Sequence, residues 1–219
     1  MNQPRWTQVD QYLVEQLVPQ DAALLAALEN NQAAGLPAID VAPNQGKLLN
    51  LLAKMVGAKR ILEIGTLGGY STLWLARALP DDGKVITLEY EAHHAEIAAQ
   101  NIRRAGLESK VTICVGAALD TLPTLADAAP FDMIFIDADK RNNPAYLEWA
   151  IQYSRSGTLI IGDNVVRNGQ VADGDTSDWN IQGVRDFLSQ MGSDPRLDAT
   201  AIQTVGAKGW DGFSLALVK

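Results

Sequence analysis

The chain has 219 residues, of which 47% are hydrophobic and 20% are charged, and these values are typical of a globular protein with one main core. The formal net charge is −8, and Lys and Arg form no cluster, which argues against a nucleic-acid partner. No apolar run is long enough to cross a bilayer, no secretory leader opens the chain, and the single cysteine, Cys114, cannot form an internal disulfide, so we expect a cytoplasmic protein without a membrane partner.

The N-terminal quarter of the sequence predicts three helices. Apolar residues recur at helical spacing over 6–18, and Pro19 ends this pattern. Asp21 is a suitable cap for a second helix over 22–34, and a third helix is predicted over 45–57. The stretch LPAIDVAP, which lies between the second and third helices, is expected to be extended or looped.

From residue 60 onward, predicted strands alternate with predicted helices. The strands are short and continuously apolar, as in a parallel sheet that is covered on both faces. They span residues 60–65, 84–90, 110–116, 131–138 and 157–164. Helical segments lie between them, around residues 70–79, 91–105, 117–127 and 143–155. This order predicts a Rossmann-like, doubly wound α/β fold with helices on both faces of the sheet.

The C-terminal end departs from the parallel pattern. After a helix predicted at about 178–191, the segments LDATAIQT and FSLALVK flank the stretch VGAKGWDG, which predicts two antiparallel strands joined by a Gly-containing loop. The expected sheet therefore has seven strands, mostly parallel with a C-terminal antiparallel hairpin. We expect one domain over 1–219, with an N-terminal helical substrate or dimer region (1–57) and a Rossmann-like core (58–219).

The first candidate binding feature is the turn EIGTLGGYS, which follows the first strand. Gly65, Gly68 and Gly69 allow a tight turn and the close approach of a ligand, although the segment is not the G-x-G-x-x-G dinucleotide fingerprint. Glu89, at the end of the second strand, could accept hydrogen bonds from both hydroxyls of a ribose. From these residues alone, a cofactor site and a ligand-free turn beside a solvated acid are about equally supported.

The second candidate feature is a pair of acidic strand ends. FDMIFIDADK ends in Asp137, Asp139 and Lys140, and the fifth strand ends in Asp163 and Asn164. A carboxylate behind a buried strand needs a partner, and neighbouring strand ends would bring these oxygen ligands together. They suit Mg²⁺, with Ca²⁺ or Mn²⁺ as alternatives, better than zinc. The acids could instead cap the following helices, but two acidic strand ends favour a cation.

Two further polar motifs are assigned no chemistry. His93 and His94 are adjacent at the start of a predicted helix, where their side chains diverge, and we expect them at the surface. The segment DGDTSD (173–178) lacks the Gly and Glu of a calcium-binding loop, so it is expected to be a loop with Asp178 as a helix cap.

In their order and spacing, EIGTLGGYSTLWLA, the acid in TLEYE, FIDADK and IGDN resemble the class I S-adenosylmethionine (SAM)-dependent methyltransferases. More narrowly, they are similar to the cation-dependent O-methyltransferases that include catechol and caffeoyl-CoA O-methyltransferases. The resemblance covers nearly the whole chain. It implies a SAM site that consists of Val41, Glu63, Gly65, Leu67, Gly69, Ser71, Glu89, Ala117, Ala118 and Asp137. In that site Glu89 would bind the ribose.

The same resemblance implies the metal site and the catalytic groups. Asp137, Asp163 and Asn164 fall on the family's metal ligands, and Lys140 falls on its general base, with Asp137 beside it. Asp139 would be either an outer acid or a residue that holds the loop. The implied reaction transfers a methyl group to a hydroxyl of a small, catechol-type phenolic substrate with the help of the cation. Relatives are commonly dimers, so a homodimer is expected.

Some positions depart from the family's pattern. RNNPAY follows the DADK motif, so Tyr146 would have to replace an aromatic residue that stands closer in relatives. Arg167 is expected either to meet an anionic group of the substrate or to be solvated, and Trp179 and Trp210 either to wall the substrate or to pack elsewhere. The alternative functions are an NAD-dependent oxidoreductase, which the missing fingerprint disfavours, and a non-catalytic SAM-binding protein.

Overall fold

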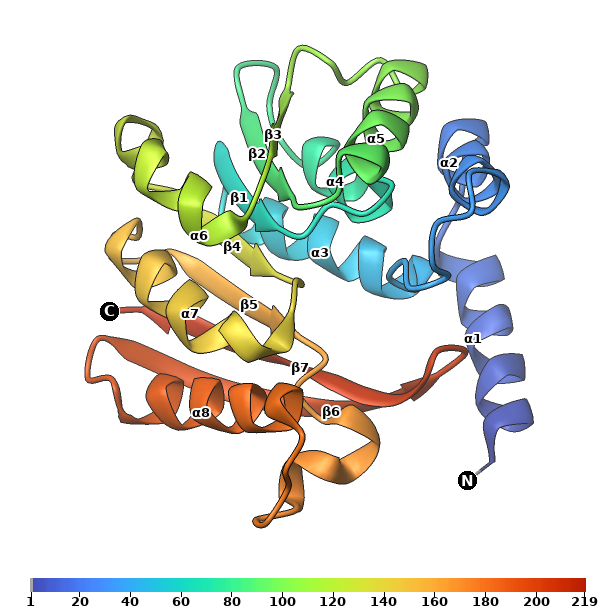
Figure 1. Cartoon of the computed structure of the whole chain (residues 1–219). Helices are drawn as coiled ribbons and strands as arrows, with labels where there is room; N and C mark the ends of the chain where they lie inside the picture. The colour runs from blue at the N-terminus through green and yellow to red at the C-terminus, as the bar shows by residue number, and fades with distance from the viewer. Residues whose placement is uncertain (1) are drawn as a thin grey trace.

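The structure, a computed structural model, describes residues 2–219 and contains one seven-stranded sheet with helices on both faces (Figure 1). The strand order is β3-β2-β1-β4-β5-β7-β6. The first five strands are parallel to one another, as expected for short apolar strands covered on both faces. They are β1 (Arg60–Ile64), β2 (Lys84–Glu89), β3 (Val111–Val115), β4 (Met133–Ile136) and β5 (Leu159–Asp163).

The last two strands form the predicted antiparallel hairpin. β6 (Leu197–Gly206) pairs with β7 (Gly209–Val218), which also lies antiparallel beside β5. Both strands run further than expected, because Gly206 pairs with Gly209 and only two residues remain in the turn. Gly209 has a φ of 101°, a conformation that residues with side chains disfavour, and this lets the chain reverse so tightly.

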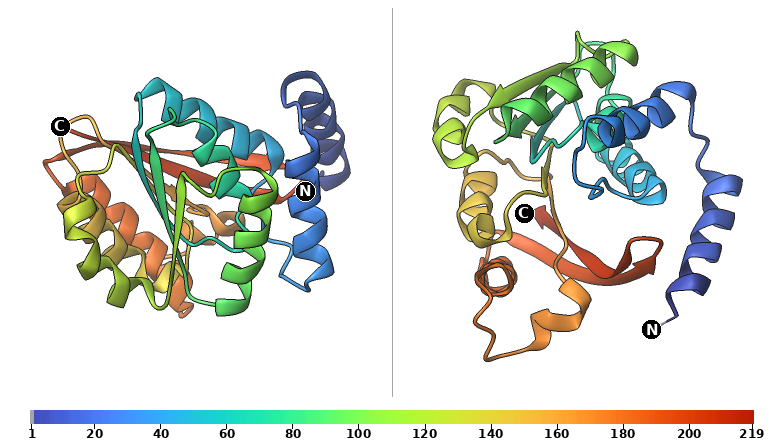
Figure 2. Two further views of the ribbon diagram at one scale, coloured as in Figure 1. Left: turned by 90° about the horizontal axis from the view of Figure 1, so that it is seen from above. Right: turned by 45° about the vertical axis from the view of Figure 1, so that its right-hand side comes forward.

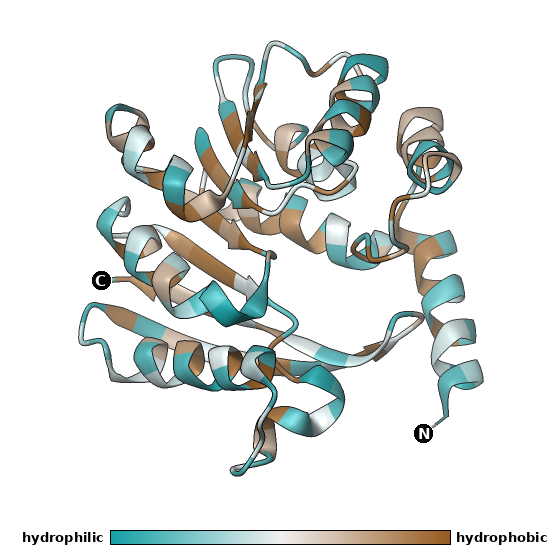
Figure 3. Ribbon diagram, viewed as in Figure 1, coloured by the Kyte–Doolittle hydropathy of each residue, from teal (hydrophilic) through white to brown (hydrophobic). Residues whose placement is uncertain are grey.

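Successive strand residues pack into two cores on opposite faces of the sheet. In β4, Ile134 and Ile136 belong to one core, whereas Met133 and Phe135 belong to the other. Figure 3 shows the parallel strands as largely hydrophobic, whereas the two hairpin strands and the helices are mixed. The first core is closed by α6 (Ala118–Thr121), the 3-10 helix η1 (Leu122–Ala128), α7 (Asn143–Gln152) and α8 (Trp179–Ser193). The second is closed by α2 (Ala22–Ala33), α3 (Pro43–Met55), α4 (Tyr70–Ala76) and α5 (Ala92–Arg104).

The N-terminal helix α1 (Gln3–Leu17) lies at the margin of the molecule, beside the tip of the hairpin (Figure 2). Gln3 Nε2 donates to the Gly206 carbonyl at 2.8 Å, and Asp10 Oδ2 accepts from the Ala207 amide at 2.7 Å. No residue from Gln3 to Leu17 is buried. The apolar positions of this helix therefore contribute little to the core of the described chain.

The segment predicted as one helix over 117–127 is divided into two. α6 has four residues, and η1 continues it with 3-10 geometry. Pro123 accounts for the change, because it has no N–H to donate within an α-helix and its ring crowds the preceding turn. Two further 3-10 segments, η2 (Lys140–Asn142) and η3 (Arg167–Ala172), lie in the connections after β4 and β5, and η3 is kinked at Asn168 and Gly169.

The predicted α/β fold, with a mostly parallel seven-stranded sheet and a C-terminal hairpin, is confirmed. Asp178 caps α8 as expected, since its side chain accepts from the Asn180 amide. Among the helices of residues 2–219, none has the length and apolar character that crossing a bilayer requires. The division into an N-terminal region (1–57) and a core (58–219) stays a prediction.

Candidate active site

A cavity of about 890 Å³ lies over the edge of the sheet where the five parallel strands end. Ligands of open α/β sheets bind beyond these carboxyl ends. The turns after all five strands line the cavity, and so does the loop between α2 and α3. Its volume falls within the range of small-molecule sites, so this cavity is the candidate active site.

The Gly-rich turn after β1 has three residues in left-handed conformations. Gly65 has a φ of 101°, and a Cβ there would collide with the Asp137 carbonyl on the neighbouring strand. Leu67 has a φ of 49° and, like Gly65, lines the cavity. Gly69 has a φ of 80° at the N-cap of α4, where a Cβ would point at Ala98. Gly69 thus shapes the turn from behind.

Glu63 is fully buried beneath this turn. Its carboxylate accepts hydrogen bonds from the hydroxyls of Ser71 at 2.6 Å, Thr72 at 2.5 Å and Thr87 at 2.7 Å. Burial raises the pKa of Glu63 to about 7, although the three hydroxyl donors act in the opposite direction. Ser71 does line the cavity, so Glu63 is connected to the cavity through the Ser71 hydroxyl.

Glu89 lines the cavity and also holds the Gly-rich turn. Its Oε2 accepts from the amides of Thr66 at 3.1 Å and Leu67 at 2.7 Å, and its Oε1 accepts from the Glu91 amide at 3.0 Å. A carboxylate oxygen has about two acceptor positions, so Oε2 is occupied by its two amide donors and Oε1 keeps one position for a ligand. The side chain is therefore fixed in place beside the cavity by backbone donors from two segments.

His94 lies in the cavity wall, so the prediction that it is a surface residue is wrong, whereas His93 is exposed. His94 Nδ1 is 3.3 Å from Glu89 Oε1. α5 begins at Ala92, directly after the end of β2, and its first turn therefore stands beside Glu89. Successive helical side chains are about 100° apart, so only one of two adjacent histidines faces the cavity.

Three further residues that the resemblance assigns to the cofactor have apolar side chains. Val41 lines the cavity from the loop between α2 and α3, which forms neither helix nor strand, as predicted. Ala117 and Ala118 line it from the turn after β3. These side chains carry no polar atoms, so polar contacts at their positions fall to backbone groups.

A buried pair of asparagines ties the α2–α3 loop to the Gly-rich turn. Asn31 is 1% exposed, and its Nδ2 donates to Asp40 Oδ1 at 2.7 Å. Asn101 Nδ2 donates to Asn31 Oδ1 and to the Gly68 carbonyl, both at 2.9 Å. Gly68 must lack a side chain, because a Cβ there would collide with the Asn31 amide. One network thus positions two segments that border the cavity.

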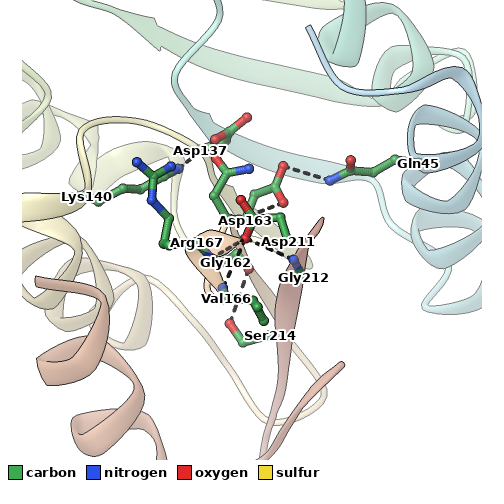
Figure 4. A network of polar contacts seen from close by, with 11 residues as sticks. Gln45, Asp137, Lys140, Gly162, Asp163, Val166, Arg167, Asp211, Gly212 and Ser214 are labelled. Atoms are coloured by element: carbon green, nitrogen blue, oxygen red, sulfur yellow. Dashed lines mark hydrogen bonds and ion pairs between the residues drawn. The ribbon is translucent and has the colours of Figure 1, made fainter. Parts of the chain in front are cut away.

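The ends of β4 and β5 place two carboxylates and an ammonium group in one part of the cavity (Figure 4). Lys140 Nζ donates to Asp137 Oδ1 at 2.7 Å. Asp163 accepts from Gln45 Nε2 at 2.7 Å and from the Asn164 amide at 2.8 Å. Residues from α3, β4 and β5 therefore meet at the edge of the sheet, although Gln45 and Asp163 are 118 positions apart.

This donor set fits a divalent cation. Asp163 is 4% exposed, and its burial, together with the negative charge of Asp137, raises the pKa of Asp163 to about 7. A doubly charged ion would stabilise two such carboxylates in their ionised forms. Asn164, with a φ of 55°, adds an amide at the same edge. The set offers oxygen ligands from two carboxylates and an amide, which suit an ion such as Mg²⁺ that keeps several non-protein ligands. Residues 2–219 contain no cluster of three His, Cys, Asp or Glu side chains.

Asp139 holds the loop that follows β4. It accepts from the Tyr146 hydroxyl at 2.5 Å and from Asn142 Nδ2 at 2.7 Å, and all three residues line the cavity. Burial of the hydroxyl, and its bond to the carboxylate, raise the pKa of Tyr146 above its usual range. Of the two expected roles of Asp139, these contacts support the one that holds the loop.

Asp211 of β7 fixes the loop that follows β5 (Figure 4). Its Oδ1 accepts from the amides of Val166 at 3.0 Å, Arg167 at 2.9 Å and Gly212 at 3.0 Å. Arg167 has a φ of 54°, and its side chain lines the cavity. The hairpin therefore determines the backbone from which Arg167 enters the site.

The two tryptophans that were candidates for the substrate wall have other contacts. Trp179 is 65% exposed, and the Arg141 guanidinium lies 5.5 Å from its ring centre. Trp210 packs on Gly169, where a Cβ would collide with the ring, and its Nε1 donates to Gln203 Oε1 at 3.0 Å. For Trp210 the contacts thus support packing within the chain.

Several residues of the site were not predicted from the sequence, among them Gln45, Asp211 and His94. Gln45 and Asp211 belong to no recognisable motif, and His94 was assigned to the surface. Only His94 had a sequence signal for a place in the site, because it follows closely after the end of a predicted strand. Gln45 and Asp211 reach the site only through long-range packing.

The fold and the site define a class of protein. A doubly wound sheet that ends in an antiparallel hairpin, with a Gly-rich turn after β1 and an acid at the end of β2, is the architecture of a SAM-dependent methyltransferase. A family model described as O-methyltransferase matches residues 16–217. The chain belongs to this O-methyltransferase family.

Individual relatives agree with this assignment. Proteins named catechol O-methyltransferase from Mycobacterium tuberculosis and Niastella koreensis are 54% and 52% identical to the chain, covering 99% and 100% of it and 98% and 100% of their own lengths. The O-methyltransferase of Bacillus cereus, solved in complex with S-adenosylhomocysteine (SAH), has a TM-score of 0.98 at 55% identity over 99% of this chain and 100% of that one. TomG of Streptomyces achromogenes, solved with SAM, has a TM-score of 0.97 at 50% identity over 100% and 99%. The predicted enzyme class, a SAM-dependent O-methyltransferase, is confirmed.

We expect Asn31→Ala to lower the free energy of unfolding by about 1–3 kcal/mol, because Asp40 and Asn101 lose a buried partner. If about 1 kcal/mol of this loss comes from disordering the α2–α3 loop and the Gly-rich turn, SAH should bind roughly fivefold more weakly. Thermal unfolding and calorimetric titration with SAH measure both effects. Gln32→Ala, at an exposed position of the same helix, is the matched control. Unchanged SAH affinity in the Asn31 variant would show that the network does not position the cofactor loops.

Proposed function

We propose that this chain transfers a methyl group from SAM to a hydroxyl of a small, catechol-type substrate with the help of a divalent cation. The observation that carries the proposal is that the Asp137–Lys140 pair and the buried Asp163 share one cavity with the Gly-rich turn. A methyl donor and a hydroxyl-activating group can thus be held side by side. The names of the two curated relatives support the catechol-type substrate.

For the cofactor, we propose that Glu89 accepts the ribose hydroxyls, because its carboxylate lines the cavity with acceptor capacity left. Glu63 and Gly69 would act from behind the turn, through the Ser71 hydroxyl and through the backbone. The remaining contacts would come from Val41, Gly65, Leu67, Ser71, Ala117, Ala118 and Asp137.

For the cation, we propose Asp137, Asp163 and Asn164 as ligands, with Mg²⁺ preferred and Ca²⁺ or Mn²⁺ as alternatives. A divalent cation bound there would favour the phenolate form of the substrate. This chemistry matters because a free phenol ionises near pH 10 and is a poor nucleophile at neutral pH.

The chain's own residues would move the proton and hold the reactants. Lys140 Nζ, which lies 2.7 Å from Asp137 Oδ1 in the structure, would accept the phenol proton. Gln45 keeps Asp163 oriented through its 2.7 Å hydrogen bond. The contact between Asp139 and Tyr146 fixes the loop that carries Lys140. The rest of the rate enhancement would come from positioning.

Methyl transfer from labelled SAM to catechol, with and without EDTA, tests this proposal. We expect labelled O-methyl product with Mg²⁺, loss of turnover in EDTA and recovery when Mg²⁺ is added in excess. SAH binding, measured by calorimetry, should persist in EDTA, because the Gly-rich turn and Glu89 do not depend on the cation. Turnover that resists EDTA would contradict the metal assignment. No product from any catechol, with SAH still bound, would contradict the substrate class.

Two alternative functions, an NAD-dependent oxidoreductase and a non-catalytic SAM-binding protein, are less well supported. Membership of the O-methyltransferase family removes the oxidoreductase alternative, which the missing dinucleotide fingerprint already disfavoured. A non-catalytic SAM-binding protein is disfavoured by the intact set of Asp137, Lys140 and Asp163, and the same assay distinguishes it.

A cytoplasmic location, the absence of nucleic-acid and membrane partners, and a homodimer stay predictions. Exposed apolar side chains on α1 and α3, among them Tyr12, Leu17 and Met55, support the homodimer. A light-scattering mass close to that of one chain would contradict it.

A further inference from the structure

Arg167 brings a guanidinium group to the part of the cavity where Lys140 and Asp137 lie (Figure 4). Across residues 2–219, no Asp or Glu oxygen lies within the 4.0 Å of an ion pair with it. Its Nε is buried and has no hydrogen-bond partner. A buried donor of a charged group is costly when it has no acceptor. The described chain supplies no anionic partner for the guanidinium, so such a partner would have to come from a ligand.

The backbone holds Arg167 in this place at a cost. Its φ of 54° is in the left-handed region, which residues with long side chains rarely adopt. Asp211 stabilises the conformation, since its carboxylate accepts the amides of Val166 and Arg167 together. The loop is therefore built to direct this side chain into the cavity rather than into solvent.

The acids nearest to this part of the cavity are committed to other groups. Under the proposed function, Asp137 and Asp163 hold the cation. Asp139 accepts from Tyr146 and from Asn142, and within residues 2–219 it forms no ion pair with Arg167. With the cation bound, the positive charge of the guanidinium is not compensated by these carboxylates.

We propose that Arg167 binds a carboxylate of the substrate, so that the preferred substrates are catechols with a carboxylate on the ring or on a short side chain. This inference rests on the proposed function and makes it more specific. A guanidinium offers a planar pair of donors that matches the two oxygens of a carboxylate. Asn180, which lines the same cavity from the first turn of α8, adds an uncharged polar side chain at the cavity wall.

Two substrates of nearly equal shape test the proposal, namely 3,4-dihydroxybenzoate and its neutral analogue 3,4-dihydroxybenzamide. For the wild-type enzyme with Mg²⁺, we expect kcat/KM to be at least about tenfold higher for the benzoate. Arg167→Gln should reduce the ratio of the two kcat/KM values by about 10- to 100-fold, as expected for the loss of a hydrogen-bonded charge pair. The change should fall mainly on KM. Arg167→Lys should restore part of the ratio, because it keeps the charge but loses the planar pair of donors.

Arg141→Gln is the matched control. It removes the same charge one residue after Lys140, but the Arg141 side chain is exposed and lies over Trp179 rather than in the cavity wall. The ratio of the two substrates should be unchanged in this variant. Melting temperatures of all variants show whether the loop after β5 keeps its structure.

Calorimetric titration in the presence of SAH measures the same preference without turnover. The benzoate should bind the wild-type protein more tightly than the benzamide, and Arg167→Gln should bind both equally. A wild-type ratio near one, or an Arg167→Gln variant that weakens both compounds equally, would overturn the inference. If neither compound is methylated, the proposed function fails, and the binding preference still decides about Arg167. If both are methylated without preference, only the role of Arg167 fails.

Discussion

Asp163→Asn should reduce methyl transfer to catechol by at least about 100- to 1,000-fold, because the substitution removes one of the two charged ligands of the proposed cation and with it several kcal/mol of charge stabilisation. SAH affinity should stay within about threefold, since the Gly-rich turn and Glu89 are untouched. Initial rates at saturating Mg²⁺ and calorimetry with SAH separate the two effects.

The same variant gives a readout that does not depend on turnover. The pKa of Asp163 is raised to about 7 in the folded chain, so its ionisation favours the unfolded state as the pH rises from about 4 toward 7. In EDTA at pH 8, Asp163→Asn should therefore melt no lower than the wild type. Mg²⁺ should raise the melting temperature of the wild type but not that of the variant.

Asp198→Asn, the same chemical change at an exposed position of β6, is the control and should behave like the wild type. An Asp163→Asn enzyme with full activity and an unchanged response to Mg²⁺ would show that no cation binds at the ends of β4 and β5.

Lys140→Met should lower kcat by about 100- to 10,000-fold at neutral pH, because the variant keeps the apolar stem but has no amine to accept the phenol proton. Mg²⁺ affinity should be equal or tighter than in the wild type, since the ammonium that occupies Asp137 Oδ1 no longer competes with the cation. Single-turnover rates and Mg²⁺ titrations measure these quantities.

The pH profile distinguishes a base from a structural residue. The residual rate of Lys140→Met should rise steadily toward pH 10, where the substrate phenol ionises without help. Lys59→Met, at an exposed position before β1, is the control. A Lys140→Met enzyme with the wild-type rate and profile would exclude Lys140 as the base, and a parallel loss of SAH affinity would indicate a role in positioning instead.

Much of the fold could be predicted because its local signals are strong. Continuous apolar strands between helical segments specify a parallel sheet covered on both faces, and the hairpin has an unmistakable pairing pattern. The sequence signals for where helices and strands begin and end were weaker. Pro123 divided a predicted helix, and Gly209 allowed a tighter turn than expected, because each acts on a single hydrogen bond or dihedral angle that periodicity does not register.

In the site, the features that could be predicted from the sequence differ still more clearly from those that could not. Asp137, Asp163 and Glu89 stand at strand ends, and the sheet topology alone places them on one edge, so their meeting in one cavity could be predicted from the sequence. The hydrogen bond from Gln45 to Asp163 and the contacts of Asp211 with the loop of Arg167 can be recognised only in the folded chain. These contacts join segments whose separation along the chain is large, and their existence depends on side-chain packing to within a fraction of an ångström. A local pattern of residue types carries no information at that distance, whereas the strand ends are brought together by the backbone topology itself.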